Sequence, residues 1–350
     1  MAGRVCLQAC KTLCRQPVCL SAMGEFDLIA RYFTRPATRA VLGVGDDCAL
    51  LQPSPEMQLA ISCDMLVEGR HFFADVDPFS LGHKALAVNL SDLAACGARP
   101  LAFTLALALP RVEEAWLEPF SRGLLALADA HGCELVGGDT TQGPLNICIT
   151  VFGEVPRGQA LLRSGARAGD DIYVSGTLGD ARLALEVLRG RLAAPASVLA
   201  AARLRLEQPT PRVALGMALR GIATAAIDVS DGLLGDLGHI MKQSGVGATV
   251  ETDIAINLVA TYAYCTRVNG LFCPEIRPDQ WLGWALAGGD DYELLFTAPA
   301  SARAGVAAAA RSSQTAITRI GRIDLESGLR LVNAQGNAVP NTYTSFDHFA

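Results

Sequence analysis

Six short apolar stretches of this chain each end at one or two aspartates, usually beside glycine, serine or threonine. The first is 41–51, in which Gly45-Asp46-Asp47 separates two apolar runs. The others end at Asp64, at Asp92, at Asp139, at Asp228 with Asp231, and at Asp290 with Asp291. Glycine lets the backbone turn tightly and approach a ligand closely, and carboxylates gathered at strand ends concentrate negative charge. The recurrence predicts one carboxylate-lined pocket assembled from many strand and loop ends.

Segments with helical or strand periodicity alternate along the chain, which predicts an α/β or α+β fold. The pair Asp77-Pro78 should start a helix, since aspartate is a good N-cap and proline suits the first turn; this helix should run to about Gly97 and carry Asn89 and Asp92. Other helices are expected at 24–33, from Pro110 and Glu113 to Gly132, at 179–190, and up to Ser244. Strands are expected at 59–62 reaching Asp64, 101–109, 134–136 delivering Asp139, 147–152, 172–174, 224–227 delivering Asp228 and Asp231, and 292–297. The segment 255–280 is interpreted as a loop with a short helix.

The chain has 350 residues, which is enough for two domains with substantial cores. A polar, glycine-rich stretch at 156–169 marks the expected boundary, between domains 23–155 and 156–350. Residues 1–22 contain basic residues and cysteines, no acid, and no apolar core of a signal peptide. We interpret them as a disordered tail, or as the result of a start codon upstream of Met23, and expect the activity not to depend on them.

Composition excludes several classes of protein. With 51% hydrophobic and 18% charged residues the chain is folded and globular. A net charge of -6 argues against a general nucleic-acid binder. The longest apolar run, 101–109, is about half of the roughly 20 residues that a membrane-spanning helix needs, so no membrane span is expected. Four of the eleven cysteines lie in the first 22 residues and the rest are scattered, which favours reduced thiols and a cytoplasmic protein.

The repeated aspartates suit hard divalent cations, and Mg²⁺ typically takes one or two carboxylates together with phosphates. A single aspartate of this kind is more often a cap or a turn residue, but six comparable sites argue against a purely structural role for all of them. Two like charges 4 Å apart cost about 4 kcal/mol near a protein surface, so a cluster makes sense only with cations. If the aspartates lie apart, this argument fails.

Other chemistries find less support. The glycine-rich phosphate loops G-x-x-x-x-G-K-[ST] and G-x-G-x-x-G are absent, and so is the G-x-S-x-G nucleophile turn. His71 follows Asp64 closely and is equally consistent with a substrate contact or a surface residue. Arg163 would by default be a solvated loop residue.

Several longer motifs resemble those of the thiamine-monophosphate kinase family. They are 24–29 (GEFDLI), 45–49 (GDDCA), 84–94 (KALAVNLSDLA), 137–141 (GGDTT), 227–233 (IDVSDGL) and 346–349 (FDHF). The resemblance extends from Met23 to the C-terminus. Gly-Asp-Asp alone would indicate only the wider superfamily, which includes aminoimidazole-ribonucleotide synthetase, selenophosphate synthetase and a hydrogenase-maturation protein. The Gly-Glu-Phe opening and the Asp-His-Phe ending favour the kinase.

The resemblance implies a two-domain fold like that of aminoimidazole-ribonucleotide synthetase, with an N-terminal sheet domain that binds ATP and magnesium and forms the dimer, and a C-terminal α/β domain. It implies ATP-dependent transfer of the γ-phosphoryl group to thiamine monophosphate, giving thiamine diphosphate, with several Mg²⁺ ions as cofactors. The implied partners are ATP, thiamine monophosphate and a second copy of the chain, with ATP near the dimer interface.

The resemblance also implies roles for individual residues. The metal positions are Asp46, Ser62, Cys63, Asp64, Asp92, Asp139, Asp228 and Asp231, of which Asp46, Asp228 and Asp231 are the catalytic candidates. The ATP positions are Ser62, Gly138, Asp139, Arg163 and Ser230. The substrate positions are His71, Asp290 and Phe346, whose ring is available to stack. Two positions depart from the family's usual pattern: Cys63 replaces a threonine hydroxyl, and Asp290 replaces a longer glutamate.

The chemistry is consistent with these roles. Donor and acceptor are both phosphate anions, so several Mg²⁺ ions would neutralise them, align an in-line attack and stabilise the transferred group. The attacking phosphate oxygen is already ionised, so no strong general base is needed. The alternatives are another ATP-dependent small-molecule synthetase or kinase of the superfamily, a metal-dependent phosphohydrolase, and a non-catalytic metal or nucleotide sensor.

Overall fold

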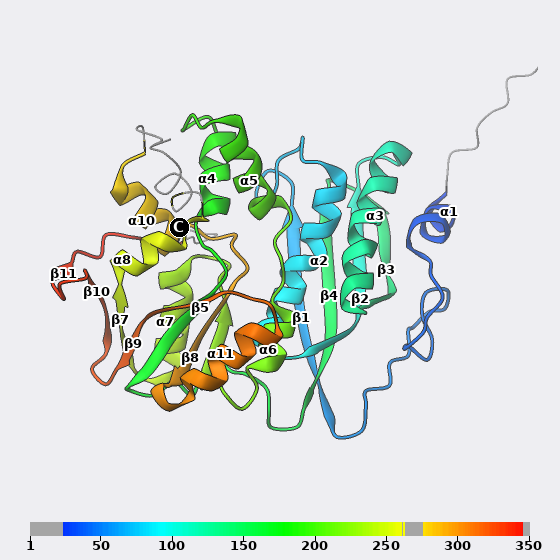
Figure 1. Ribbon diagram of the computed structural model, residues 1–350. Helices are drawn as coiled ribbons and strands as arrows, with labels where there is room; N and C mark the ends of the chain where they lie inside the picture. Colours follow the sequence, from blue (N-terminus) through cyan, green and yellow to red (C-terminus); the bar gives the residue numbers. More distant parts are fainter. Residues whose placement is uncertain (1–23, 261, 263–275, 346–350) are drawn as a thin grey trace, which may run out of the picture.

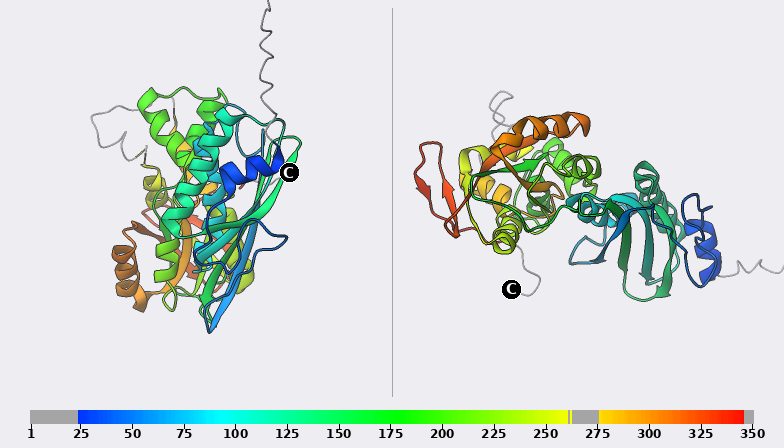
Figure 2. Two further views of the ribbon diagram at one scale, coloured as in Figure 1. Left: turned by 90° about the vertical axis from the view of Figure 1, so that its right-hand side faces the viewer. Right: turned by 90° about the horizontal axis from the view of Figure 1, so that it is seen from below.

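Two β-sheets, connected by residues 157–169, organise the chain (Figure 1). The computed structural model describes residues 24–260, 262 and 276–345. The expectations for residues 1–22, for Phe346 and for part of the segment 255–280 therefore lie outside the described residues. The two sheet-centred halves lie side by side along the long axis of the molecule (Figure 2). This mixed arrangement of sheets and helices confirms the predicted fold class.

The first sheet has the strand order β1-β4-β2-β3. Its strands are β1 (Met57–Val67), β2 (Arg99–Leu109), β3 (Glu134–Gln142) and β4 (Asn146–Pro156). Only β2 and β3 run parallel. The helices α2 (Pro78–Ala95) and α3 (Glu114–His131) cover one face of the sheet, and the short helix α1 (Glu25–Leu28), continued by a π-helical turn at Ile29–Phe33, lies at the end of this half (Figure 1).

The second sheet has the order β11-β10-β7-β9-β5-β8-β6 and is mainly antiparallel, with β7 and β10 parallel. Its strands are β5 (Asp170–Ser175), β6 (Ala225–Asp228), β7 (Gly247–Glu251), β8 (Leu294–Pro299), β9 (Ile317–Asp324), β10 (Gly328–Val332) and β11 (Ala338–Val339). Its helices are α4 (Asp180–Leu188), α5 (Ala196–Glu207), α6 (Val213–Ala218), α7 (Leu233–Ser244), α8 (Thr252–Ala255), α10 (Pro278–Ala287) and α11 (Arg303–Ser312), with short 3-10 turns at Ile256–Leu258 and Ala300–Ala302. Helices pack on both faces, because Phe296 of β8 faces the core that contains Val306 of α11, whereas Leu295 faces the core that contains Leu237 of α7.

Local sequence signals located the helix ends of the first half. The backbone N–H of Ser80 donates to Asp77 Oδ2 at 2.9 Å, which is the predicted N-cap of α2. α3 ends at Gly132, whose φ of 57° is left-handed. The expected strand ends were wrong: β1 continues past Asp64 to Val67, and β3 continues past Asp139 to Gln142. Both strands are longer because each pairs with a neighbour along its whole length.

Helix α2 lies between the two halves and contacts elements of both sheets. Two glycines let it approach α3 closely, since a Cβ at Gly82 would lie 2.1 Å from the carbonyl oxygen of Phe120, and one at Gly123 would lie 2.0 Å from that of Phe79. On the side of the second half, a Cβ at Gly216 of α6 would lie 2.0 Å from the carbonyl oxygen of Ala94. Among the described residues, no helix is long and apolar enough to cross a membrane.

These contacts generate a prediction. Gly123→Ala should destabilise the protein by about 1–3 kcal/mol, the usual cost of overpacking, because its methyl group collides with the backbone of α2. Gly238→Ala on α7 is the matched control: a Cβ there meets nothing within 4 Å, so better helix propensity should leave stability unchanged or raise it by up to about 1 kcal/mol. Urea unfolding measures both variants; equal midpoints would contradict the close packing of α2.

Candidate functional site

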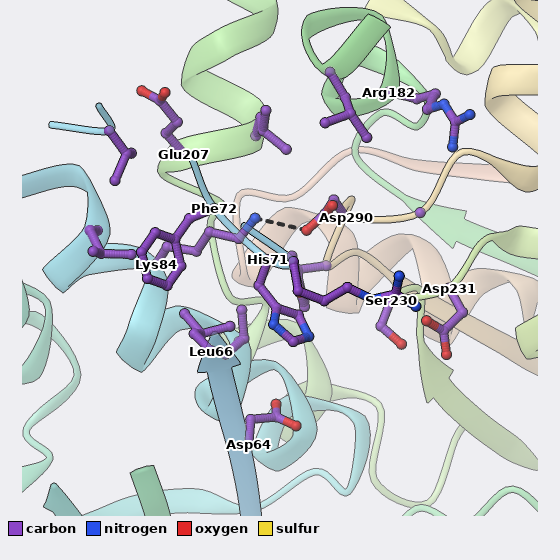
Figure 3. A pocket seen from close by; sticks show the side chains of 18 of the residues that line it. Asp64, Leu66, His71, Phe72, Lys84, Arg182, Glu207, Ser230, Asp231 and Asp290 are labelled. Atoms are coloured by element: carbon purple, nitrogen blue, oxygen red, sulfur yellow. Dashed lines mark hydrogen bonds and ion pairs between the residues drawn. The ribbon is translucent and has the colours of Figure 1, made fainter. Parts of the chain in front are cut away.

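A cavity of about 420 Å³ lies where the two halves meet, and we call it the interdomain pocket (Figure 3). Its walls come from β1, the following loop, α2, α4, α5 and the loops after β6 and before β8. Of the residues predicted from sequence, it gathers Asp64, His71, Asp92, Arg163, Asp228, Ser230, Asp231 and Asp290. Segments more than 200 residues apart in the chain therefore meet at one site.

Two hydroxyl groups hold carboxylates of the cluster in place. Ser62 of β1 donates to Asp92 Oδ2 of α2 at 2.5 Å. Ser91, the neighbour of Asp92, donates to Asp228 Oδ2 at the end of β6 at 2.7 Å. Asp64, Asp92, Asp228 and Asp231 form what we call the acidic cluster. The two hydrogen bonds link β1 to α2 and α2 to β6.

The loop 230–232 is held by the buried carboxylate of Asp236, in the first turn of α7. Its Oδ2 accepts hydrogen bonds from the backbone N–H groups of Ser230, Asp231 and Gly232 at 3.1, 3.3 and 3.2 Å. Gly232 has a φ of 119°, which a residue with a side chain rarely adopts. This turn presents Ser230 and Asp231 to the pocket (Figure 3).

Burial and mutual repulsion raise the pKa values of three carboxyl groups, those of Asp64, Asp92 and Asp228. The pKa of Asp64 rises to about 6, first through burial and then through the charges of Asp92 and Asp231. Burial, followed by the charge of Asp92, raises the pKa of Asp228 to about 8, against the effect of the Ser91 hydrogen bond. The pKa of Asp92 is also raised by burial, although Ser62 and the Arg163 guanidinium oppose the shift. The cluster is thus short of positive charge.

The donor set fits magnesium bound together with phosphates. Within the described ranges, no three acidic, histidine or cysteine side chains converge closely enough to hold a cation by themselves. Magnesium usually takes only one or two protein carboxylates and completes its shell with phosphate oxygens and water. The acidic cluster offers carboxylate oxygens that lack enough positive charge, and it opens to a pocket. It therefore has the chemistry of a site where protein and phosphate oxygens bind Mg²⁺ together.

The same pocket also contains a buried cation and aromatic rings. Lys84 of α2 donates to Asp290 Oδ1 at 2.8 Å. His71 Nδ1 accepts the backbone N–H of Val67 at 3.0 Å, which orients the ring in the pocket. Phe72 and Phe73 line the cavity beside it. A ligand that binds cations through a phosphate end and packs an apolar ring end beside Phe72 and Phe73 would fit such a pocket.

Three predicted residues lie together in another cavity. Asp46, Gly138 and Asp139 line a second cavity of about 680 Å³, the N-terminal pocket, together with the helical segment that contains Phe26 and Phe33. The expectation of one pocket is therefore wrong for a single chain, in which the predicted aspartates divide between two. Gly138 is required by close strand pairing, since a Cβ there would lie 1.9 Å from the Leu105 carbonyl oxygen.

Sheet topology explains this division. β1, with Asp64, and β3, with Asp139, are opposite edges of the four-stranded sheet, which puts them about 14 Å apart at three strand spacings. Pairing runs from Asp139 through Ala106 and Cys148 to Met65, the neighbour of Asp64. Because neighbouring residues of a strand point to opposite faces, Asp139 and Asp64 also face opposite sides of the sheet.

Cys63 does not join Ser62 and Asp64 at the interdomain pocket. It points to the other face of β1, where its Sγ lies 3.5 Å from Cys148 Sγ. The alternation of side chains along β1 separates it from both neighbours. In a single chain the structure thus places the sulfur on the side of the sheet away from α2.

Sequence reasoning missed Lys84 and Asp236 as site residues. Lys84 lies two helical turns and one residue before Asp92, on the same face of α2, so helical periodicity could have identified it. Asp236 had a weaker signal, because a carboxylate that caps a preceding loop looks like an ordinary first-turn residue.

Comparisons with known proteins find matches for both halves of the chain. Residues 45–155 match the AIR synthase related protein, N-terminal domain, and residues 167–332 match the corresponding C-terminal domain. The chain is 47% identical to the thiamine-monophosphate kinase of Salmonella typhimurium, over 94% of this chain and 99% of the relative. The crystal structure of the thiamine-monophosphate kinase from Stenotrophomonas maltophilia has a TM-score of 0.76 and 46% identity, covering 89% of this chain and 95% of that one. A structure described as AaThiL complexed with AMPPCP and TMP has a TM-score of 0.71 and 30% identity, covering 85% and 89%.

The raised pKa values predict a pH dependence of stability. The folded chain binds more protons than the unfolded chain between pH 3.8, the ordinary pKa, and the raised pKa values of about 6 for Asp64 and about 8 for Asp228. Stability without divalent cations should therefore fall as pH rises from 5 to 8.5. The variant Asp228→Asn should lose less stability over this pH range. At pH 8.5 its free energy of unfolding should exceed that of the wild type by at least about 1.4 kcal/mol, the equivalent of one pKa unit.

Chemical unfolding in chelator at several pH values measures this effect, and Glu118→Gln, at an exposed position of α3, is the control. Mg²⁺ should stabilise the wild type more at pH 8.5 than at pH 5, since protonated carboxyl groups bind it poorly. A wild type whose stability rises over this pH range would contradict the electrostatics of the cluster.

Proposed function

This chain belongs to the thiamine-monophosphate kinase family, and we propose how its own residues serve the reaction. The protein catalyses the ATP-dependent phosphorylation of thiamine monophosphate to thiamine diphosphate. Similarity to named kinases over nearly the whole chain carries this assignment. A solved relative is described as a complex with AMPPCP and TMP, which supports the same pair of ligands here.

We propose that the phosphates of ATP and thiamine monophosphate meet at the acidic cluster of the interdomain pocket. Asp228 and Asp231 would hold magnesium at the reacting centre, with Asp64 and Asp92 contributing from the first half. Magnesium, when bound, supplies the positive charge that neutralises and aligns the two phosphates. Asp236 keeps Asp231 in place by fixing its backbone, and Ser62 and Ser91 keep Asp92 and Asp228 in place.

No side chain needs to remove a proton from the acceptor, because its phosphate oxygen is already ionised at neutral pH. Binding and orientation are therefore the work of the protein residues. Arg163, near Asp92, and Ser230, on the turn, are the proposed ATP contacts within this pocket. His71 and Asp290, in the same pocket, are the proposed contacts to thiamine monophosphate.

The N-terminal pocket is proposed as a further part of the ATP and metal site, with Asp46, Gly138 and Asp139. It lies on the sheet face turned away from α2, next to β2 and β3. That face is apolar and open on β1, where Leu59, Ile61 and Met65 are 44%, 58% and 52% exposed. Exposed apolar side chains in one row are typical of a protein interface. We propose that a second copy of the chain covers this face, so that the N-terminal pocket lies beside the dimer interface.

We also propose a cytoplasmic location, since ATP is the co-substrate and the cysteines in the described ranges are free thiols.

Turnover tests the catalytic assignment. The wild type with ATP, Mg²⁺ and thiamine monophosphate should yield ADP and thiamine diphosphate, resolved by chromatography. Asp231→Asn should lower the rate about 100-fold or more, as expected for the loss of a group that stabilises charge at the reacting centre, while the fold persists. Glu118→Gln, at an exposed position of α3, should keep the wild-type rate. Near-normal turnover in Asp231→Asn would exclude the proposed metal role, and ATP binding without product would indicate a sensor.

The dimer interface has its own test. Ile61→Asp places a charge in the middle of the exposed apolar row, so light scattering after gel filtration should show a monomer where the wild type is a dimer. Leu325→Asp is the matched control, because Leu325 is 82% exposed in the turn between β9 and β10. A dimer that survives Ile61→Asp would refute this interface.

A further inference from the structure

Lys84 is a buried cation in the wall of the interdomain pocket. Its side chain is 4% exposed, and its Nζ donates to Asp290 Oδ1 at 2.8 Å, whereas the side chain of Asp290 is 34% exposed. Arginine supplies nearly all the positive charge of this chain, and lysine occurs only at Lys11, Lys84 and Lys242. A buried ammonium group needs an anionic partner, because leaving it unpaired is costly.

The ion pair fixes a carboxylate that the backbone already constrains. Asp290 has a φ of 60°, in the left-handed region that residues with side chains rarely adopt. Its N–H donates to the Ser230 carbonyl oxygen at 2.8 Å, next to the turn that carries Asp231. Backbone and side chain are thus held from two sides, one from each half of the molecule.

The choice of lysine determines how much of the carboxylate is occupied. An ammonium group acts as a point charge and contacts one oxygen here, while an arginine fork tends to take both oxygens of a carboxylate. The partial exposure of Asp290 is consistent with a second oxygen that faces the pocket. In Figure 3 the pair is drawn above His71, with Ser230 and Asp231 to its right.

We propose that Lys84 is a positioning residue for the acceptor substrate. It holds one oxygen of Asp290 so that the other contacts the positively charged thiazolium ring of thiamine monophosphate. This inference rests on the proposed function of the same pocket. An aspartate has one rotatable bond fewer than a glutamate, so a single contact is enough to orient its carboxylate.

Steady-state kinetics of Lys84→Met test the proposal. KM for thiamine monophosphate should rise about tenfold or more, while kcat and KM for ATP stay within about threefold, since a lost charged hydrogen bond affects substrate binding and not the transferred group. Lys242→Met, at the exposed lysine of α7, is the matched control. An unchanged KM for thiamine monophosphate, or a loss confined to kcat, would overturn the proposal.

A double-mutant cycle separates positioning from direct contact. If Lys84 acts through Asp290, the variant Lys84→Met with Asp290→Asn should have the same KM for thiamine monophosphate as Asp290→Asn alone. If the two substitutions instead raise KM for thiamine monophosphate by factors that multiply in the double variant, Lys84 contacts the substrate by itself, which overturns the proposal. The variant Lys84→Arg keeps the charge, but it should still raise this KM because the guanidinium group would occupy both carboxylate oxygens of Asp290. A wild-type KM in Lys84→Arg would mean that only the charge of Lys84 matters, which contradicts the positioning role.

Different results would contradict the proposed function and the role of Lys84. A wild type that does not turn over thiamine monophosphate would defeat the proposed function. A wild type that does, with Lys84→Met kinetically identical to it, would defeat only the role of Lys84.

Discussion

Repulsion between carboxylates at the junction of the two sheets is the constraint on which the site depends. Folding brings Asp64, Asp92, Asp228 and Asp231 into one pocket, and burial raises the pKa values of the first three. Such an arrangement costs stability, and natural proteins commonly retain this cost where activity requires it. The remaining features of the junction are those that keep the charges in place: Ser62, Ser91 and the backbone turn fixed by Asp236.

Helix α2 packs against both sheets and carries side chains of the pocket. It carries a cation and an anion on the same face, Lys84 toward the loop before β8 and Asp92 toward β1. Close glycine contacts with α3 and α6 define its position on either side. A small shift of α2 would therefore alter both ends of the pocket together, which links the packing of α2 against α3 and α6 to the geometry of the pocket.

Local signals in the sequence predicted elements better than they predicted proximity. The cap at Asp77 and the stop at Gly132 depend on a few neighbouring residues, so they could be identified without the fold. Whether Asp139 lies beside Asp64 depends on strand order, which places β4 and β2 between them. The family motifs likewise named Cys63 and Asp290 as site positions. They could not show that Cys63 points away from α2 or that Lys84 pairs with Asp290.

Strand β1 shows how one segment can carry two roles. Its even-numbered residues, Ser62 and Asp64, face α2 and the acidic pocket, while Ile61 and Met65 form the exposed apolar row proposed as the dimer interface. Since side chains alternate along a strand, a register slip of one residue would exchange the two faces completely. The pairing of β1 with β4 over eleven residues opposes such a slip. The proposed catalytic and interface roles thus both depend on the register of a single edge strand, so a sequence change that loosens this pairing should weaken both.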